Sequence, residues 1–366
     1  MIVSSVLELS CKMLCKQIMD SLRFLARVRY QPLSYQSYTC SRMIDGVTGL
    51  VILVLWQMIT SLSVMAAEPI VLSLSRTPLS LPFYVAQHEG FFYDEGIEVK
   101  VNEVIGGHRS MQQLLDGEAD LATSTETVLM FNSFKRNDFA VIASFVSTTD
   151  DVKVIAHGTS GITRPEQLAY KRVGTILKSA SHYYLDTLTL LNGIDPKSVQ
   201  LVSLQPEDMA SALERKEVDA IAVWQPFAYR AEREVSGAKM LPDDGFYNLS
   251  FNLSASRQII EQRSDDLVKL LRALDRATRF ISTEPLKAQT ILRSRLKLDQ
   301  AYVDWIWPRY QYQLTLGKSL LVSLESEARW AIEEGHITAL RSPNYLSFIH
   351  SLPLRRILPA AVGIVE

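Results

Sequence analysis

Short runs of hydroxyl residues and glycines recur where predicted strands end and predicted helices begin. These runs cover residues 75–80, 106–108, 124–126 and 179–183. In open α/β sheets, ligands bind outside the carboxyl ends of the strands, and helix N-termini there present backbone N–H groups that attract anions. The pattern therefore predicts a binding site for a small anion.

Charged and aromatic side chains beside these runs suggest further contacts. Arg76 is placed to pair with an acidic head group of a ligand. Trp224 and Gln225 stand at the end of a predicted strand, where the indole ring could form the wall of a pocket or could simply end the strand. Glu126 fits a contact to a ligand amine, and equally a favourable interaction with its own helix dipole.

Each hydroxyl or glycine run also has an ordinary structural explanation. Ser179 and Ser181 fit helix N-caps as well as ligand contacts. Gly106-Gly107 fits a plain turn, and His182 fits a surface or core histidine. The sequence leaves these alternatives open.

Motifs of the common enzyme classes are absent from the sequence. It contains no Gly-x-Ser-x-Gly, no Gly-x-Gly-x-x-Gly after a predicted strand and no phosphate-binding P-loop. The histidines are scattered without the spacing of a metal site: His88, His108, His157, His182, His336 and His350. We therefore predict no catalytic residue, no metal and no cofactor.

The first 67 residues differ in character from the rest of the chain. Residues 47–67 carry no charge and end in small side chains, as a secretory signal peptide does at its cleavage site. The same stretch is long enough to span a bilayer as an uncleaved anchor. Residues 1–42 are too long for the n-region of a signal, so translation starts either at Met43 or at Met1, with a basic cytoplasmic tail.

All three cysteines, Cys11, Cys15 and Cys40, precede the predicted cleavage site. Residues 68–366 contain none, which excludes a disulfide, a thiolate nucleophile and a cysteine metal site from the exported part. The full length of 366 residues allows roughly two domains, and the net charge of -2 gives no reason to expect nucleic acid.

Strand and helix signals alternate after residue 70, which predicts an α/β fold with mostly parallel sheets. Strands are predicted over 71–75, 97–104, 119–123, 171–176, 199–204 and 218–224. Helices are predicted over 82–89, 109–115, 179–191, 209–215, 264–281, 299–307 and 319–334. The order helix, turn, aspartate, apolar strand occurs around Asp120 and again around Asp219, which indicates two similar lobes.

Several segments resemble one protein family in the family's own order. They are residues 82–99, 114–122, 181–183, 204–206 and 218–226. Together they resemble the nitrate/sulfonate/taurine-type solute-binding proteins of ABC importers, over about residues 70–350. Each segment alone is weak evidence, whereas the set is specific.

The resemblance implies a two-lobed periplasmic binding protein of type II topology, with the ligand cleft between the lobes. Residues 68–150 would form lobe 1, residues 151–250 lobe 2, and residues 251–366 would return to lobe 1 and add C-terminal helices. Residues 1–67 would be the N-terminal extension with its signal peptide or anchor. The chain would cross between lobes near 147–156 and 247–255, and the lobes would close by a hinge.

The resemblance also implies positions in the cleft and a partner. With the residue-based candidates, the predicted ligand contacts are Ser75, Arg76, Thr77, Ser80, Phe83, Gly106, Gly107, Ser124, Thr125, Glu126, Ser179, Ser181, His182, Tyr183, Trp224 and Gln225. Gln225 stands where relatives often carry an acidic or small residue. We expect a periplasmic monomer that captures a small organic anion and delivers it to an ABC permease. A sulfonate or taurine-like molecule is the first expectation, and nitrate, pyrimidine-precursor, riboflavin-like and aromatic carboxylate ligands remain open.

Two other functions remain open from the sequence. Pyrimidine-precursor synthases and sulfinate-cleaving enzymes share the implied fold but rely on cysteine, which residues 68–366 lack. A membrane-tethered ligand sensor would require that residues 47–67 stay uncleaved.

Overall fold

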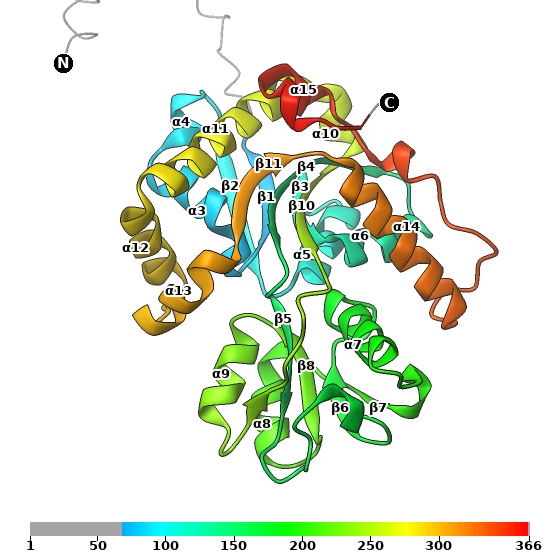
Figure 1. Ribbon diagram of the computed structural model, residues 1–366. Coiled ribbons are helices and arrows are strands. Elements are labelled where there is room, and N and C mark those ends of the chain that lie inside the picture. Colours follow the sequence, from blue (N-terminus) through cyan, green and yellow to red (C-terminus); the bar gives the residue numbers. More distant parts are fainter. Residues whose placement is uncertain (1–67, 365–366) are drawn as a thin grey trace, which may run out of the picture. The chain divides into compact units, whose positions relative to one another are not determined.

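Two mixed β-sheets organise the computed structural model, which describes residues 68–364 (Figure 1). The six-stranded sheet has the order β11-β4-β10-β3-β1-β2 and the five-stranded sheet the order β7-β6-β8-β5-β9. We call the first sheet with its helices lobe 1 and the second lobe 2. The two-lobed α/β architecture predicted from the sequence is confirmed.

The strands of lobe 1 are β1 (Ile70–Ser75), β2 (Val99–Val104), β3 (Leu121–Thr125), β4 (Phe139–Thr148), β10 (Leu249–Ser256) and β11 (Gln311–Thr315). β1 pairs in parallel with β2 and β3, whereas β10 runs antiparallel to both β3 and β4, and β11 antiparallel to β4. The sheet is thus mixed rather than mostly parallel, because β10, which re-enters the lobe, and β11 run against the other four strands.

The strands of lobe 2 are β5 (Val152–Ala156), β6 (Arg172–Thr175), β7 (Gln200–Ser203), β8 (Ala220–Trp224) and β9 (Lys239–Met240). β6 pairs in parallel with β7 and β8, and β5 runs antiparallel to β8 and β9. The chain passes from lobe 1 to lobe 2 between Thr148 and Val152 and returns between Met240 and Leu249. The lobe boundaries at residues 150 and 250 stay predictions.

Helices cover both sheets. In lobe 1 they are α3 (Leu81–His88), α4 (Phe91–Asp94), α5 (Gly107–Leu115), α6 (Glu126–Ser133), α10 (Arg257–Gln262), α11 (Ser264–Thr283), α12 (Pro285–Leu296), α13 (Gln300–Ile306), α14 (Lys318–Glu333) and α15 (Leu352–Ile357). In lobe 2 they are α7 (Ala180–Leu191), α8 (Met209–Glu214) and α9 (Phe227–Glu234). α11 packs against α3, α4 and α15, and α14 packs against α6.

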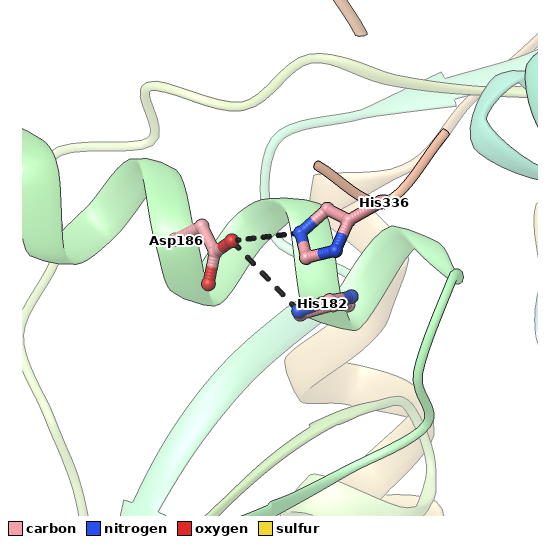
Figure 2. Close-up of side chains that lie close together, drawn as sticks. All are labelled: His182, Asp186 and His336. Carbon is pink, nitrogen blue, oxygen red and sulfur yellow. Dashed lines mark ion pairs between the residues drawn. The ribbon is translucent and has the colours of Figure 1, made fainter. Parts of the chain in front are cut away.

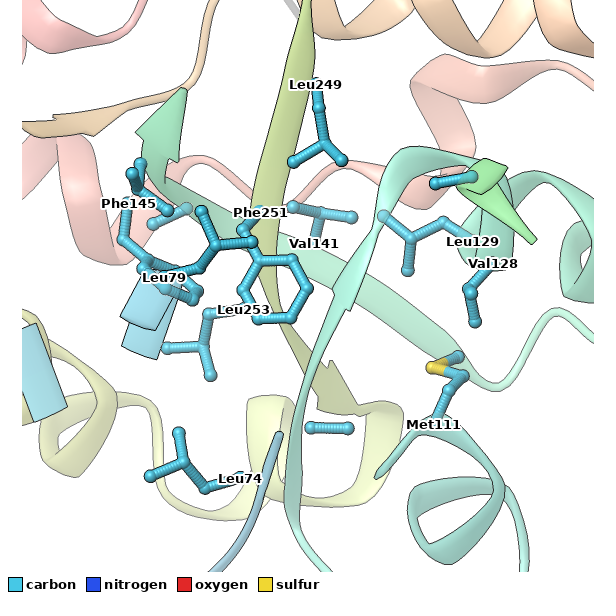
Figure 3. Close-up of a cluster of buried hydrophobic side chains, with 14 of the residues drawn as sticks. Leu74, Leu79, Met111, Val128, Leu129, Val141, Phe145, Leu249, Phe251 and Leu253 are labelled. Atoms are coloured by element: carbon cyan, nitrogen blue, oxygen red, sulfur yellow. The ribbon is translucent and has the colours of Figure 1, made fainter. Parts of the chain in front are cut away.

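Burial of apolar side chains explains this packing. The face of α11 predicted from its periodicity is buried, including Leu267, Leu271 and Leu274. The core of lobe 1 extends to the strand ends that face lobe 2, where Leu79, Val128 and Phe251 lie (Figure 3). The core thus holds the loops of the candidate site in place.

Within residues 68–364, no helix combines the length and the apolar character needed to cross a membrane. The predicted signal peptide or anchor (residues 47–67), the alternative starts and the three cysteines lie outside the described residues.

Candidate functional site

A cavity lies where the strand ends of lobe 1 meet the first turn of α7 and the end of β8 in lobe 2. It contains about 400 Å³ of space between atoms, part of which is open solvent. It is lined by Ser75, Thr77, Leu79, Gly106, Gly107, His108, Thr125, Val128, Asp151, Ser179, Ala180, Trp224, Leu249 and Phe251.

Three α-helices begin at the cavity wall. The N-cap residues are Gly106 for α5, Thr125 for α6 and Ser179 for α7. None of the three makes a side-chain capping hydrogen bond, so the first N–H groups of these helices are not satisfied by their own caps. Since two helices come from lobe 1 and one from lobe 2, their positive dipole ends converge from both lobes.

The glycines at the start of α5 are required by close packing. A Cβ on Gly107 would lie 2.9 Å from the Cα of Ser124, a backbone contact that cannot relax by side-chain rotation. Gly106 has a φ of +89°, and a Cβ there would lie 2.6 Å from His108 Cε1 and 3.5 Å from Trp224 Cζ2. Only glycines let the N-terminus of α5 approach β3 and the indole of lobe 2 this closely.

Buried polar atoms without partners lie at the start of α6 and after the end of β8. Among the described residues, Ser124 Oγ, Thr125 Oγ1 and Gln225 Nε2 are buried and have no hydrogen-bond partner. The other amide atom of Gln225, Oε1, accepts a hydrogen bond from Tyr229 N at 3.1 Å. Buried polar groups are rarely left unsatisfied, so Thr125 Oγ1, whose residue lines the cavity, is a candidate for a ligand contact. Ser124 and Gln225, also predicted as ligand contacts, are fully buried and do not line the cavity.

No arginine or lysine lines the cavity. Its one carboxyl group belongs to Asp151, which is 3% exposed and accepts a hydrogen bond from Tyr310 Oη at 2.5 Å. Burial raises the pKa of Asp151 to about 7, although the Tyr310 hydroxyl and Lys153 act in the opposite direction. Among the described residues, the one basic side chain in the lining is the imidazole of His108, and burial, with Arg109 beside it, lowers the pKa of that imidazole and favours its neutral form. An anion in this cavity would therefore be held by N–H groups and hydroxyls rather than by a charged basic side chain.

The structure brings some of the predicted contacts together at the cavity and sets others elsewhere. Those that line it are Ser75, Thr77, Gly106, Gly107, Thr125, Ser179 and Trp224. Arg76 is exposed, lies 4.0 Å from Glu103 and lines a second groove outside the cavity. The guanidinium expected to bind the ligand is therefore directed to an acidic neighbour.

Several predicted residues lie directly behind the lining. Ser80 Oγ donates a hydrogen bond to Ser75 O at 2.7 Å, and Phe83 packs edge-on against Phe145 at 4.9 Å. Ser181 Oγ accepts a hydrogen bond from Thr175 Oγ1 at 3.2 Å. These contacts fix the loops whose neighbours face the cavity.

Glu126 is fully buried beneath the site and does not line it. Its carboxyl oxygens accept hydrogen bonds from Tyr247 Oη at 2.8 Å, Ser250 N at 2.9 Å and Ser250 Oγ at 3.1 Å. Burial raises the pKa of Glu126 to about 7 against these hydrogen bonds. The carboxyl group thus ties the start of α6 to the chain that returns from lobe 2.

His182 and Tyr183 lie on α7 but outside the cavity lining. His182 Nε2 is 3.8 Å from Asp186 Oδ2 (Figure 2), and the imidazole packs against Trp330 and His336. Burial lowers the pKa of His182 to about 4. Tyr183 packs edge-on against Tyr247 and Trp330.

The sequence reasoning missed Asp151 and the apolar lining residues Leu79, Val128, Leu249 and Phe251. Asp151, Leu249 and Phe251 lie in the two predicted crossings between lobes, and Leu79 lies in the predicted run 75–80, so their places in the chain were available signals. Val128 reads as an ordinary core residue, and nothing in the sequence separates it from the core.

The geometry can be compared with known proteins. A family model described as NMT1/THI5 like matches residues 77–288. The chain belongs to this family. A putative aliphatic sulfonates-binding protein of Bacillus subtilis is 25% identical over 231 residues, which cover 61% of this chain and 69% of the relative.

The chain is also similar to a solved binding protein and to an enzyme. The periplasmic aliphatic sulphonate binding protein of Escherichia coli has a TM-score of 0.67 at 17% identity, covering 78% of this chain and 92% of that one. A 4-amino-5-hydroxymethyl-2-methylpyrimidine phosphate synthase of Saccharomyces cerevisiae is 22% identical over 295 residues, 75% of this chain and 84% of the relative. The first similarity supports the periplasmic binding protein fold, and the second adds an enzyme to the relatives.

Proposed function

We propose that this chain is the solute-binding component of an ABC importer and that it holds a small organic anion in the cavity between its lobes. The observation that carries the proposal is the convergence of the α5, α6 and α7 N-termini on one cavity from both lobes. Such an arrangement attracts a negative head group without a basic side chain. We propose, as parts of the same role, that the lining residues contact the ligand, that the lobes close on it by a hinge, and that the protein delivers it to a permease.

The ligand that we propose is a sulfonate with a short apolar or amine-bearing tail. The relative named as an aliphatic sulfonates-binding protein supports the head group. Leu249, Phe251 and Trp224 offer apolar surface for the tail. Asp151 offers the cavity's one carboxyl group to an ammonium, which would favour a taurine-like ligand.

Location and assembly follow from this role. We propose that the protein works outside the cytoplasmic membrane as a monomer, either released after cleavage or held by residues 47–67. N-terminal sequencing of the exported protein would distinguish these two forms, and a detergent-dependent native protein would favour the tether.

Titration calorimetry with a panel of sulfonates tests the proposal. We expect heat of binding for taurine or a short alkanesulfonate, and none for a carboxylic acid of the same length. Asp151→Asn should weaken taurine binding more than binding of the ethanesulfonate that lacks the amine. Heat with another class of solute and none with any sulfonate would overturn the ligand assignment, and no binding of any small anion would overturn the role.

A same-fold enzyme is the second candidate, because one relative is a synthase. Residues 68–366 contain no cysteine to act as a nucleophile. We therefore propose binding without turnover. Incubating the purified protein with any solute that it binds and recovering that solute unchanged would support this distinction.

A further inference from the structure

Two histidines and an aspartate that are far apart in the sequence meet at the contact between the lobes. His182 and Asp186 stand one turn apart on α7, and His336 follows the C-terminal end of α14 (Figure 2). Asp186 Oδ2 lies 3.8 Å from His182 Nε2 and 3.6 Å from His336 Nε2. The three side chains offer ligand atoms that all lie within 4.8 Å of one another.

These separations are close to those of a metal centre. Ligand atoms at about 2.0–2.2 Å from a tetrahedral zinc ion lie roughly 3.3 Å apart. The two distances to Asp186 Oδ2, 3.6 and 3.8 Å, exceed this value by a few tenths of an ångström, and the two imidazole ligand atoms lie within 4.8 Å of each other. The spacing of His182 and Asp186 already places both on one face of α7.

The ring nitrogens that face the aspartate are not otherwise used. In the part of the chain that the structure describes, Nε2 of His182 and Nε2 of His336 have no hydrogen-bond partner. His182 and Asp186 are 2% and 4% exposed. A buried imidazole nitrogen aimed at a carboxylate without bonding distance to it leaves room for a bridging ion.

The surroundings of Asp186 match the second layer of a metal site. Trp330 Nε1 donates a hydrogen bond to Asp186 Oδ2 at 3.0 Å, and such contacts orient ligating carboxylates. The side chain of His336 is 22% exposed, which gives an ion a route from solvent and leaves a position for water.

One contact opposes metal binding. Lys178 N donates a hydrogen bond to His182 Nδ1 at 3.2 Å, which places the proton of the neutral ring on Nε2. Coordination through Nε2 would move that proton to Nδ1 and break the contact. The loss of one neutral hydrogen bond is small beside the gain from three metal–ligand bonds.

We propose that His182, Asp186 and His336 bind a divalent transition metal of the zinc class, with water completing the coordination. Two imidazoles and one carboxylate suit zinc, whereas magnesium and calcium prefer oxygen ligands alone. Because α7 belongs to lobe 2 and α14 packs on α6 of lobe 1, the ion would join the lobes. This site is separate from the ligand cavity and does not depend on the proposed transport role.

Zinc binding to the full chain tests the proposal. The three cysteines are replaced by serine and any purification tag lacks histidine, since both would bind zinc on their own. After removal of metal with a chelator, calorimetry with Zn²⁺ should give one site per chain. His336→Ala and Asp186→Asn should each weaken it at least about tenfold, and His88→Ala, at an exposed histidine beside Glu89, should leave it unchanged.

Hydrogen exchange gives a second readout that does not rely on the variants. Zn²⁺ should slow exchange both in α7 and around His336, whereas Mg²⁺ should slow neither. Zinc binding that survives both substitutions would overturn the proposed ligands. The absence of one-site zinc binding would overturn the metal site. Protection from exchange confined to one lobe would overturn the connection between the lobes.

Discussion

The smallest side chains of the cavity have the largest influence on its shape. Gly106 and Gly107 let the start of α5 lie against β3 and Trp224, which brings backbone N–H groups to the cavity wall. A longer side chain could not replace this close approach, because a backbone N–H group reaches the ligand only where the backbone itself lies close to the ligand. In the proposed binding role, recognition in this cavity would depend on backbone position more than on the charge of any side chain.

Gly107→Ala should weaken binding of the sulfonate identified by calorimetry by at least about tenfold. Its Cβ would lie 2.9 Å from the Cα of Ser124, so α5 has to move away from the cavity, and misplaced donors lose affinity steeply. Calorimetry measures the effect. Gly317→Ala is the matched control, because its nearest neighbour would be a side-chain atom at 3.5 Å, and an equal loss there would contradict the explanation.

At the residue scale, the sequence predicted the types of group at the site better than their partners. Thr125, Ser179 and Trp224 line the cavity as strand-end and helix-start positions should. Arg76 lies beside Glu103 and His182 packs against His336, and no local pattern in the sequence indicates these two contacts. Long-range partners depend on how the elements pack, which spacing along the chain does not encode.

At the scale of elements, the alternating part of the chain was the most predictable. The strand predicted over 218–224 is β8 and the helix over 264–281 is α11, because their apolar periodicity follows from burial on one or two faces. For the segment of the antiparallel strand β10, the sequence predicted only that the chain returns there from lobe 2 to lobe 1. Its hydrogen bonds to β3 and β4 join segments more than a hundred residues apart. Local sequence patterns therefore do not predict the mixed order of the sheet.

The contact between α6 and α14 buries two carboxyl groups near each other. Glu126 and Glu327 are 0% and 1% exposed, and burial raises the pKa of Glu327 well above its usual range, with Glu126 adding to the rise. Both oxygens of Glu327 lack a partner of ordinary hydrogen-bond geometry, and the nearby Thr127 hydroxyl only partly offsets the rise. The protonated form is therefore the one that fits this helix contact.

Glu327→Gln should stabilise the protein at pH 7.5 by about 1–3 kcal/mol, because an unpartnered buried carboxyl is replaced by a neutral amide. An acid whose pKa is raised on folding binds its proton more tightly in the folded state, so it adds stability at low pH that is lost as pH rises. For Glu126 this window runs from its usual pKa of 4.5 to about 7, and for Glu327 it extends higher.

Urea unfolding at pH 5.5 and 7.5 measures this effect. The free energy of unfolding of the parent protein should fall from pH 5.5 to pH 7.5, and that of Glu327→Gln should fall less. Glu333→Gln, at an exposed position of the same helix, should leave the pH dependence as it is in the parent. A steeper fall in Glu327→Gln would show that the carboxyl is not the source of the pH dependence.

At the scale of the whole molecule, the two lobes touch at several places outside the cavity. Arg109 of α5 donates to Glu207 Oε1 at 2.7 Å and to Gln205 Oε1 at 2.9 Å, both in lobe 2. Tyr229 of α9 packs edge-on against Tyr302 of α13 at 4.9 Å. Together with the cluster of His182, these contacts form only when the lobes are together, so they favour the closed arrangement over an open one.

Glu207→Gln tests whether such contacts contribute to ligand retention. If ligand binding requires closure, losing the ion pair with Arg109 lowers the population of the closed form and weakens affinity by that factor. The Arg109 and Glu207 side chains are 37% and 36% exposed, so solvent screens the pair and we expect a loss of only about two- to fivefold. The loss should shrink at high salt, because screening already weakens the pair in the parent protein.

Calorimetry with the bound sulfonate at low and high salt measures the effect, and thermal unfolding of both proteins checks that the fold is unchanged. Glu217→Gln is the matched control, since Glu217 forms an exposed ion pair with Arg215 inside lobe 2. If both variants lose affinity equally, the effect is one of general charge. If only Glu207→Gln loses it, and the loss disappears at high salt, the contact between the lobes sets part of the affinity for the ligand.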